Sequence, residues 1–222
     1  MSVWEQRLLA SINASAAKRL TLIFELLSDW WVFRNSEVAE SSSADVLYEF
    51  YRMAGRSLNR ICQQNRILPP DSLESLDQKV QFATENQGVY AWAVDSTEGD
   101  PPVFGRFQET NASWFLEAPA LSLFLVQFFM LELLIGSRLG ASVACIDRSE
   151  LDAVLGEIVP LAFPDWHWPA YPSRFFARGN ALAFCSPNGD AYSLWVGGRA
   201  ASDVAFMRQY VNPSWEHVCL DG

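Results

Sequence analysis

Few side chains of this 222-residue chain stand at spacings that could do chemistry. Its two histidines, His167 and His217, belong to no HxxxH or HxE pattern, and no cysteine lies at the spacing of a zinc ligand. Cys219 is close enough to His217 to share a strand face with it, but no third group is evident that would orient the imidazole as a base. We therefore predict no metal site, and we interpret Cys219 and His217 as structural.

Paired carboxylates could act as general acid and general base, and Glu85 with Asp95 or Asp100 offers such a pair. An acidic chain contains many pairs of this kind, however, and nothing in the sequence marks these as perturbed. No glycine spacing matches a phosphate-binding or dinucleotide-binding loop, and no GxSxG motif occurs. The sequence predicts no catalytic residue and no cofactor, which indicates a protein that is not an enzyme.

The charge balance argues against a nucleic-acid partner. Sixteen Lys and Arg residues against twenty-six Asp and Glu residues give a net charge of −10, and the longest basic run is Lys18-Arg19. Nucleic-acid binding depends on basic residues that neutralise phosphates. An acidic surface would instead speed the encounter with a basic protein such as a nuclease, although it would equally serve solubility alone. Both interpretations of the charge stay open.

Cysteine usage and the N-terminal sequence predict a cytoplasmic protein. The four cysteines form no CxxC pair, and Cys145 and Cys185 lie in apolar stretches that predict buried positions in a reduced protein. Residues 1–20 lack the basic and apolar regions of a signal peptide.

One apolar stretch, residues 120–135, invites comparison with a membrane span. It is shorter than the roughly 20 residues that cross a bilayer, and it contains Gln127 and Glu132. We predict instead a buried helix that is covered on most sides, with a sheet on one flank and no contact with a membrane.

Residue periodicity predicts the elements that must position these groups. Helices are expected at residues 4–33, about 44–54, 120–135, 147–159 and 203–210. Ser43 or Asp45 would cap the second helix, Gly55 would end it, and Ser149 would cap the fourth. Strands are expected at 80–83, 89–94, from 103, 141–146, 175–178, 181–184 and 191–196, with hairpin turns at 84–88 and 186–190 and a loop at 35–44. This mixture predicts an α+β fold, with a mixed or antiparallel sheet packed by helices.

Four segments occur in an order that resembles one known family. They are FYRMAGR at 50–56, NRILPP at 65–70, VQFATENQGVYAW at 80–92 and DPPV at 100–103. A helix ending in FYxxxG, a leucine-proline segment, an ENQGxxxW strand pair and a DPPV turn are similar to those of the SUKH superfamily across residues 45–136. ENQG followed by Trp and then DPPV is the more specific part of this pattern.

The resemblance implies one SUKH-like domain over residues 1–222. An N-terminal helix and loop (1–44) would precede the matching core (45–136), and C-terminal strands and helices (137–222) would follow. The resemblance also implies a non-catalytic, protein-binding role, most often as an immunity protein that neutralises a cognate toxin. Because some relatives in eukaryotes and viruses are regulatory, a regulatory or scaffold protein of the same fold is the alternative, and an enzyme of unrecognised type is a third.

The motif residues allow a structural and a functional interpretation. In the first, Asn86 and Gln87 satisfy backbone groups of a tight turn, Gly88 supplies a positive φ, and Trp92 fills the core beneath. In the second, this corner forms the rim of a pocket that contacts a basic partner. The predicted partner-binding residues are Glu85, Asn86, Gln87, Trp92, Asp95, Asp100, Pro101 and Pro102.

A proline-rich stretch near residue 170 leaves a second question open. Trp166, Trp168 and Tyr171 could form a surface anchor for a partner, or they could cover the core.

Overall fold

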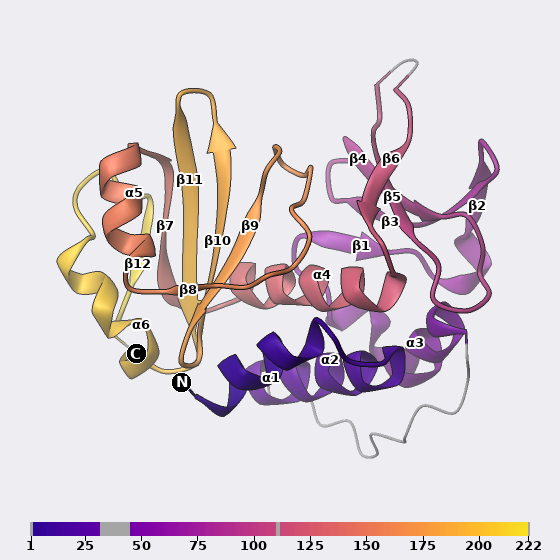
Figure 1. The fold of residues 1–222 in the computed structure, drawn as a ribbon, viewed down its shortest axis with the longest axis horizontal. Helices are drawn as coiled ribbons and strands as arrows, with labels where there is room; N and C mark the ends of the chain where they lie inside the picture. The colour runs from indigo at the N-terminus through magenta and orange to yellow at the C-terminus, as the bar shows by residue number, and fades with distance from the viewer. Residues whose placement is uncertain (1, 32–44, 110–111, 222) are drawn as a thin grey trace. The chain divides into compact units, whose positions relative to one another are not determined.

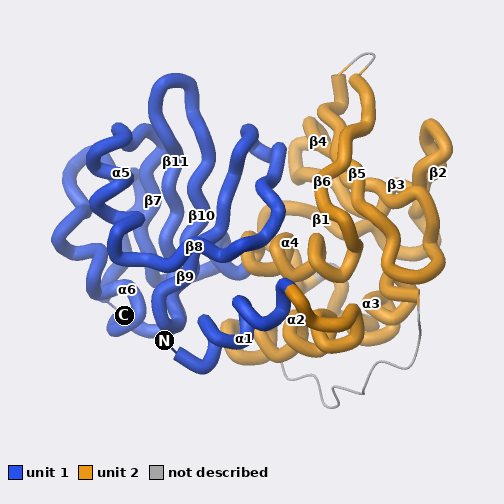
Figure 2. Tube along the Cα trace, viewed as in Figure 1, with its two compact units in different colours: residues 1–12, 133–222 blue, residues 13–132 orange. Residues whose placement is uncertain are grey.

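The computed structural model describes residues 2–31, 45–109 and 112–221. The chain divides into two compact units (Figure 2): unit 1 contains residues 1–12 and 133–222, and unit 2 contains residues 13–132. The fold is α+β, as predicted, and every strand pair described in its two sheets is antiparallel. The single domain expected over residues 1–222 stays a prediction.

Unit 2 combines helices with one antiparallel sheet (Figure 1). Its described elements are α2 (Ala16–Trp31), α3 (Val46–Ala54), the 3₁₀ helices η1 (Gly55–Arg60) and η2 (Pro70–Ser72), strands β1 (Asn65–Ile67), β2 (Glu74–Leu76), β3 (Lys79–Glu85), β4 (Tyr90–Val94), β5 (Val103–Phe107) and β6 (Phe115–Ala118), and α4 (Leu121–Ile135) as far as residue 132. The strands follow the order β1-β3-β4-β5-β6, and β2 also pairs with β3.

Aromatic side chains join the sheet of unit 2 to α4. The Trp92 ring lies 5.8 Å from that of Phe124 and 5.9 Å from that of Phe128, measured between centroids. Phe50 of α3 contacts Phe24 of α2 and Phe129 of α4 in the same way, at 5.9 and 5.5 Å. The apolar sequence of α4 thus reflects a helix buried on nearly all sides. No helix in the described part of the chain is both long and apolar enough to cross a bilayer.

Unit 1 is built on a second antiparallel sheet. Its described elements are α1 (Val3–Ser11), β7 (Leu139–Ile146), α5 (Arg148–Leu155), β8 (Val159–Pro160), β9 (Arg174–Arg178), β10 (Ala181–Asn188), β11 (Ala191–Gly198), α6 (Ala201–Val204), the 3₁₀ helix η3 (Ala205–Gln209) and β12 (His217–Cys219). The strand order is β12-β7-β11-β10-β9-β8. Leu151 and Val154 of α5, Val204 of α6 and Met207 of η3 share one hydrophobic core with Val196 of the sheet.

The prediction of a single helix over residues 4–33 is wrong. The structure has two helices instead, because Ser15 begins a new one by accepting the N–H of Lys18 and of Arg19 through its hydroxyl and its carbonyl oxygen. The first helix is held separately, since the Glu5 carboxylate accepts the N–H of Gly179 at 3.1 Å. The predicted residues 32–33, the loop at 35–44 and the Ser43 cap lie outside the described residues.

Three further expectations differ from the structure. Asp147 caps α5 in place of Ser149, because its carboxylate accepts the N–H of Glu150 at 2.9 Å. Cys145 is exposed rather than buried, since β7 has one extra residue opposite Tyr192–Leu194, which breaks the alternation of the strand. The helix expected at 203–210 is a short α6 followed by the 3₁₀ helix η3.

Two residues of the proline-rich stretch differ in burial, and an anchoring role for the exposed one stays a prediction. Trp166 is completely buried and packs edge-on against Phe175, whereas Tyr171 is 59% exposed.

Gly105 of β5 provides a test of the packing in unit 2. A Cβ atom there would lie 2.1 Å from the Tyr90 hydroxyl, which donates a hydrogen bond to Glu117 at 2.9 Å. We expect Gly105→Ala to lower the free energy of unfolding in urea by about 1–3 kcal/mol, as overpacking does. In a Tyr90→Phe background the same change should lower it less, because the hydroxyl is gone. An equal loss in both backgrounds would contradict this packing.

Candidate functional site

The turn between β3 and β4 contains three of the predicted partner-binding residues. The buried Glu85 carboxylate accepts the N–H of Gln87 at 2.8 Å and that of Val89 at 3.5 Å. The structural interpretation expected the side-chain amides of Asn86 and Gln87 to hold this turn. Both side chains are exposed instead, and the Glu85 carboxylate holds the turn. Gly88 has the predicted positive φ, +72°. The turn is therefore fixed from below while its two amide side chains face solvent.

The DPPV segment holds the start of α4. The Asp100 carboxylate accepts the N–H of Ser122 at 2.7 Å and its hydroxyl at 2.6 Å. The carbonyl oxygen of Pro101 accepts the N–H of Leu121 at 2.7 Å. A carboxylate is well placed at this end of a helix, where unpaired N–H groups and the helix dipole favour negative charge.

The eight predicted residues do not form one surface. The Glu85 turn and the Asp100 loop lie at opposite ends of β4, whose five residues extend about 15 Å. Trp92 lies between them, completely buried. Asp95 is exposed and Pro102 is half-buried. Contact of these residues with a partner stays a prediction.

A groove of about 670 Å³ lies beside the Glu85 turn in unit 2. Residues 62–69 line it together with Leu58, Ser72 and Asn86. Gln63, Arg66 and Asn86 are exposed there. Apart from Arg66, the polar side chains of the groove are amides and a hydroxyl, so it presents mostly neutral hydrogen-bonding groups to solvent.

One buried carboxylate of α4 holds the segment at residues 63–65, which forms one wall of this groove. Glu132 accepts the backbone N–H groups of Gln63, of Gln64 at 2.8 Å and of Asn65 at 2.9 Å. It also accepts the Asn65 side-chain amide at 2.8 Å. Burial raises the pKa of the Glu132 carboxyl, and these N–H donors act in the opposite direction. An irregular segment with few hydrogen bonds of its own is thus fixed to the central helix.

Glu85 contacts both walls of the groove, which are the segment at residues 63–65 and the turn that contains Asn86. Besides the turn that it holds, its carboxylate lies 3.4 Å from the side-chain nitrogen of Gln64. Glu85 and Glu132 are both buried, at 3% and 0% exposure. Two carboxylates beneath the surface therefore position a set of amides above it.

Cys62 and Glu132 close the outer edge of β1. The N–H of Ile67 is directed at the Cys62 thiol, and Glu132 accepts that of Asn65. The pKa of the Cys62 thiol is raised to about 12, chiefly by burial and also by the charge of Glu132, while the Ile67 N–H acts in the opposite direction. With these side chains on its edge, β1 is protected against the addition of another strand, so a partner in the groove would meet side chains.

Sequence reasoning singled out Glu85 and Asn86 but missed the role of Glu132 and of the backbone at 63–65 in building the groove. It noted Glu132 only as a charge that argues against a membrane span, although a carboxylate in a fully apolar helix is itself a signal, because such a group needs donors when buried. The donors at 63–65 carry no such signal, since a backbone N–H is present at nearly every residue. No three His, Cys, Asp or Glu side chains of residues 2–31, 45–109 and 112–221 gather as a metal site requires.

Comparison with family models, curated proteins and solved structures gives no match to this chain. The resemblance to SUKH proteins therefore stays a prediction that rests on the four segments quoted above.

Removing the Glu132 carboxylate should weaken unit 2. We expect Glu132→Ala to lower the free energy of unfolding by on the order of 3 kcal/mol, because several N–H groups lose their acceptor. Glu132→Gln should lower the free energy of unfolding less, since its amide oxygen can still accept hydrogen bonds from some of the N–H groups of residues 63–65. Urea denaturation measures both, and Glu74→Ala on exposed β2 serves as a control that changes stability by about 0.5 kcal/mol or less. A Glu132→Ala protein as stable as this control would contradict the role of Glu132.

The environment of Cys62 predicts slow alkylation. Because the thiolate is the reactive form, a thiol with a pKa of about 12 is almost entirely unreactive at pH 8. We expect iodoacetamide to modify the exposed Cys145 first and Cys62 much later, as followed by peptide mass spectrometry. Equal rates at the two cysteines would show that Cys62 does not lie in the environment described.

Proposed function

We propose that this chain is a non-catalytic, protein-binding protein of the immunity type, which acts in the cytoplasm and neutralises a cognate toxin by direct binding. The observation that carries the proposal is the groove of unit 2, where two buried carboxylates fix loops whose amides remain exposed. Surfaces held in place before binding lose less conformational entropy when a partner docks.

The residues of the groove suit recognition of another polypeptide. Gln63, Asn86 and Ser72 can donate and accept hydrogen bonds with backbone or polar side chains. Within residues 2–31, 45–109 and 112–221, no hydrogen bond or ion pair is described for the side chains of Gln63 and Asn86, and both are exposed. A partner can therefore use them without disturbing the scaffold.

The charge of the chain favours a basic partner. With a net charge of −10, long-range attraction would speed the encounter with a cationic toxin domain such as a nuclease, and salt would weaken that attraction. Acidic residues also outnumber basic ones within residues 13–132. A nucleic acid would be repelled by the same charge.

The toxin is the part of the proposal that depends on the SUKH resemblance. A regulatory or scaffold protein of the same fold would use the same kind of groove on a cellular protein. The gene neighbourhood separates the two, because an immunity protein is encoded beside its toxin.

The proposal predicts a one-to-one complex with the toxin domain encoded by a neighbouring gene. In isothermal titration calorimetry, we expect Gln63→Ala combined with Asn86→Ala to raise the dissociation constant about tenfold or more. Gln209→Ala, an exposed residue of unit 1, is the matched control and should bind like the unchanged protein. Cells that express the double variant should also be less protected from the toxin.

Two results would count against different parts of this account. Full affinity of the double variant would show that the partner does not use the groove. Failure to bind or protect against any neighbouring toxin would remove the immunity role and leave a regulatory or scaffold protein.

A further inference from the structure

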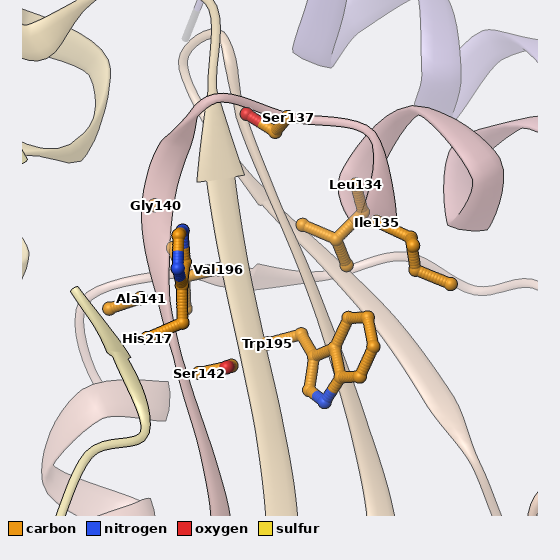
Figure 3. Close-up of a pocket in the computed structure, with 9 residues that line it drawn as sticks. All are labelled: Leu134, Ile135, Ser137, Gly140, Ala141, Ser142, Trp195, Val196 and His217. Atoms are coloured by element: carbon orange, nitrogen blue, oxygen red, sulfur yellow. The ribbon is translucent and has the colours of Figure 1, made fainter. Parts of the chain in front are cut away.

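A hollow of about 270 Å³ opens over strands β12, β7 and β11 of unit 1 (Figure 3). Leu134 and Ile135, at the end of α4, form its apolar side. His217, Ser142 and Trp195 form its polar side, one from each strand. The hollow is separate from the groove of unit 2, and no residue is shared between them.

The strand register explains why the hollow exists. Ser142 of β7 lies directly opposite His217 of β12 on one side and Trp195 of β11 on the other. Directly opposed residues place their side chains on the same face of a sheet, with Cβ atoms roughly 5 Å apart. The three therefore form a row in which the short serine leaves a space between two rings, as Figure 3 shows.

Backbone packing keeps the floor of the hollow free of a further side chain. A Cβ atom at Gly140 would lie 2.2 Å from the carbonyl oxygen of Val196, so no side chain fits there. The hydroxyl of Ser137 is already used, because it hydrogen-bonds to the carbonyl oxygens of Leu139 and Gly198 at 2.8 and 2.9 Å.

Three polar groups of the hollow are available to a ligand. No hydrogen bond is described for the Ser142 hydroxyl, the His217 imidazole or the Trp195 indole N–H within the part of the chain that the structure covers. A pocket with an apolar side and a few converging polar groups is typical of a recognition site.

The net charge of the chain favours a cation in the hollow over an anion. No Asp, Glu, Lys or Arg is among the residues that line the hollow, and the exposed Glu216 and Arg138 are only sequence neighbours of lining residues. The whole chain carries a net charge of −10, so an anionic ligand would be repelled at long range.

We propose that this hollow binds an arginine side chain of a partner protein. The planar guanidinium fits between the two rings and stacks on the indole of Trp195, the aromatic ring that attracts cations most strongly. Its N–H groups donate to the Ser142 hydroxyl, and its aliphatic stem lies against Leu134 and Ile135. The site adds a contact on unit 1 and does not depend on the role of the groove.

Nuclear magnetic resonance of the full chain tests the site with small probes. N-acetyl-arginine amide should shift the Trp195 indole N–H signal and the His217 ring signals in a saturable way. N-acetyl-citrulline amide, which has nearly the same shape and no charge, should not. Trp195→Leu identifies the indole signal by its loss, and in this variant the His217 signals should report a dissociation constant about two- to fivefold higher, as expected for one lost cation–π contact.

Two serine variants locate the site. Ser142→Leu fills the space between the rings and should abolish the shift of the Trp195 signal, while Ser202→Leu, at an exposed position of α6, should leave it unchanged. Equal shifts from both probes, or a Trp195 signal that the arginine compound does not move, would overturn the proposal. If Ser142→Leu does not fold, the comparison of the two probes on the unchanged protein still decides. Because no toxin is used, these outcomes are independent of the proposed immunity role.

Discussion

A buried carboxylate that must find hydrogen-bond donors is the constraint on which the surface of unit 2 depends. Helix α4 is apolar because it is surrounded by protein, and Glu132 is completely buried within it. An isolated carboxylate in such a place would cost several kcal/mol. The backbone N–H groups of residues 63–65 satisfy it, and in doing so they fix a segment that has little regular structure of its own. The groove beside β1 is a consequence of this arrangement.

The same principle recurs at two other carboxylates of unit 2. Glu85 holds the turn before β4, and Asp100 holds the N-terminal end of α4. In each case an acidic side chain supplies an acceptor where the backbone has none to offer. These acidic residues stabilise the scaffold, and the side chains left to meet a partner are neutral amides such as Gln63 and Asn86. The row of His217, Ser142 and Trp195 in unit 1 differs, because strand register alone creates its hollow.

Much of the fold could be predicted from the sequence, because burial and turn chemistry leave local signals. The alternation before Thr84 and the β-rich run through Trp92 predicted the hairpin of β3 and β4, and the apolar run predicted α4. The break at Ser15 and the short strands β1, β2 and β12 escaped, since their stability comes from tertiary contacts. The site was harder still. The ENQG and DPPV segments, which belong to one sequence pattern, lie at opposite ends of β4. No sequence pattern shows that Glu132 contacts a segment nearly seventy residues earlier in the chain.

Amide hydrogen exchange at Gln63, Gln64 and Asn65 tests the central claim most directly. Backbone N–H groups that donate to a buried acceptor exchange only when the structure opens, even on an irregular segment. In the unbound protein, these three amides should therefore exchange much more slowly than the amide of Thr97, which lies in the exposed loop after β4. Exchange as fast as at Thr97 would mean that Glu132 does not hold this segment, and the groove would then not be a surface formed before binding.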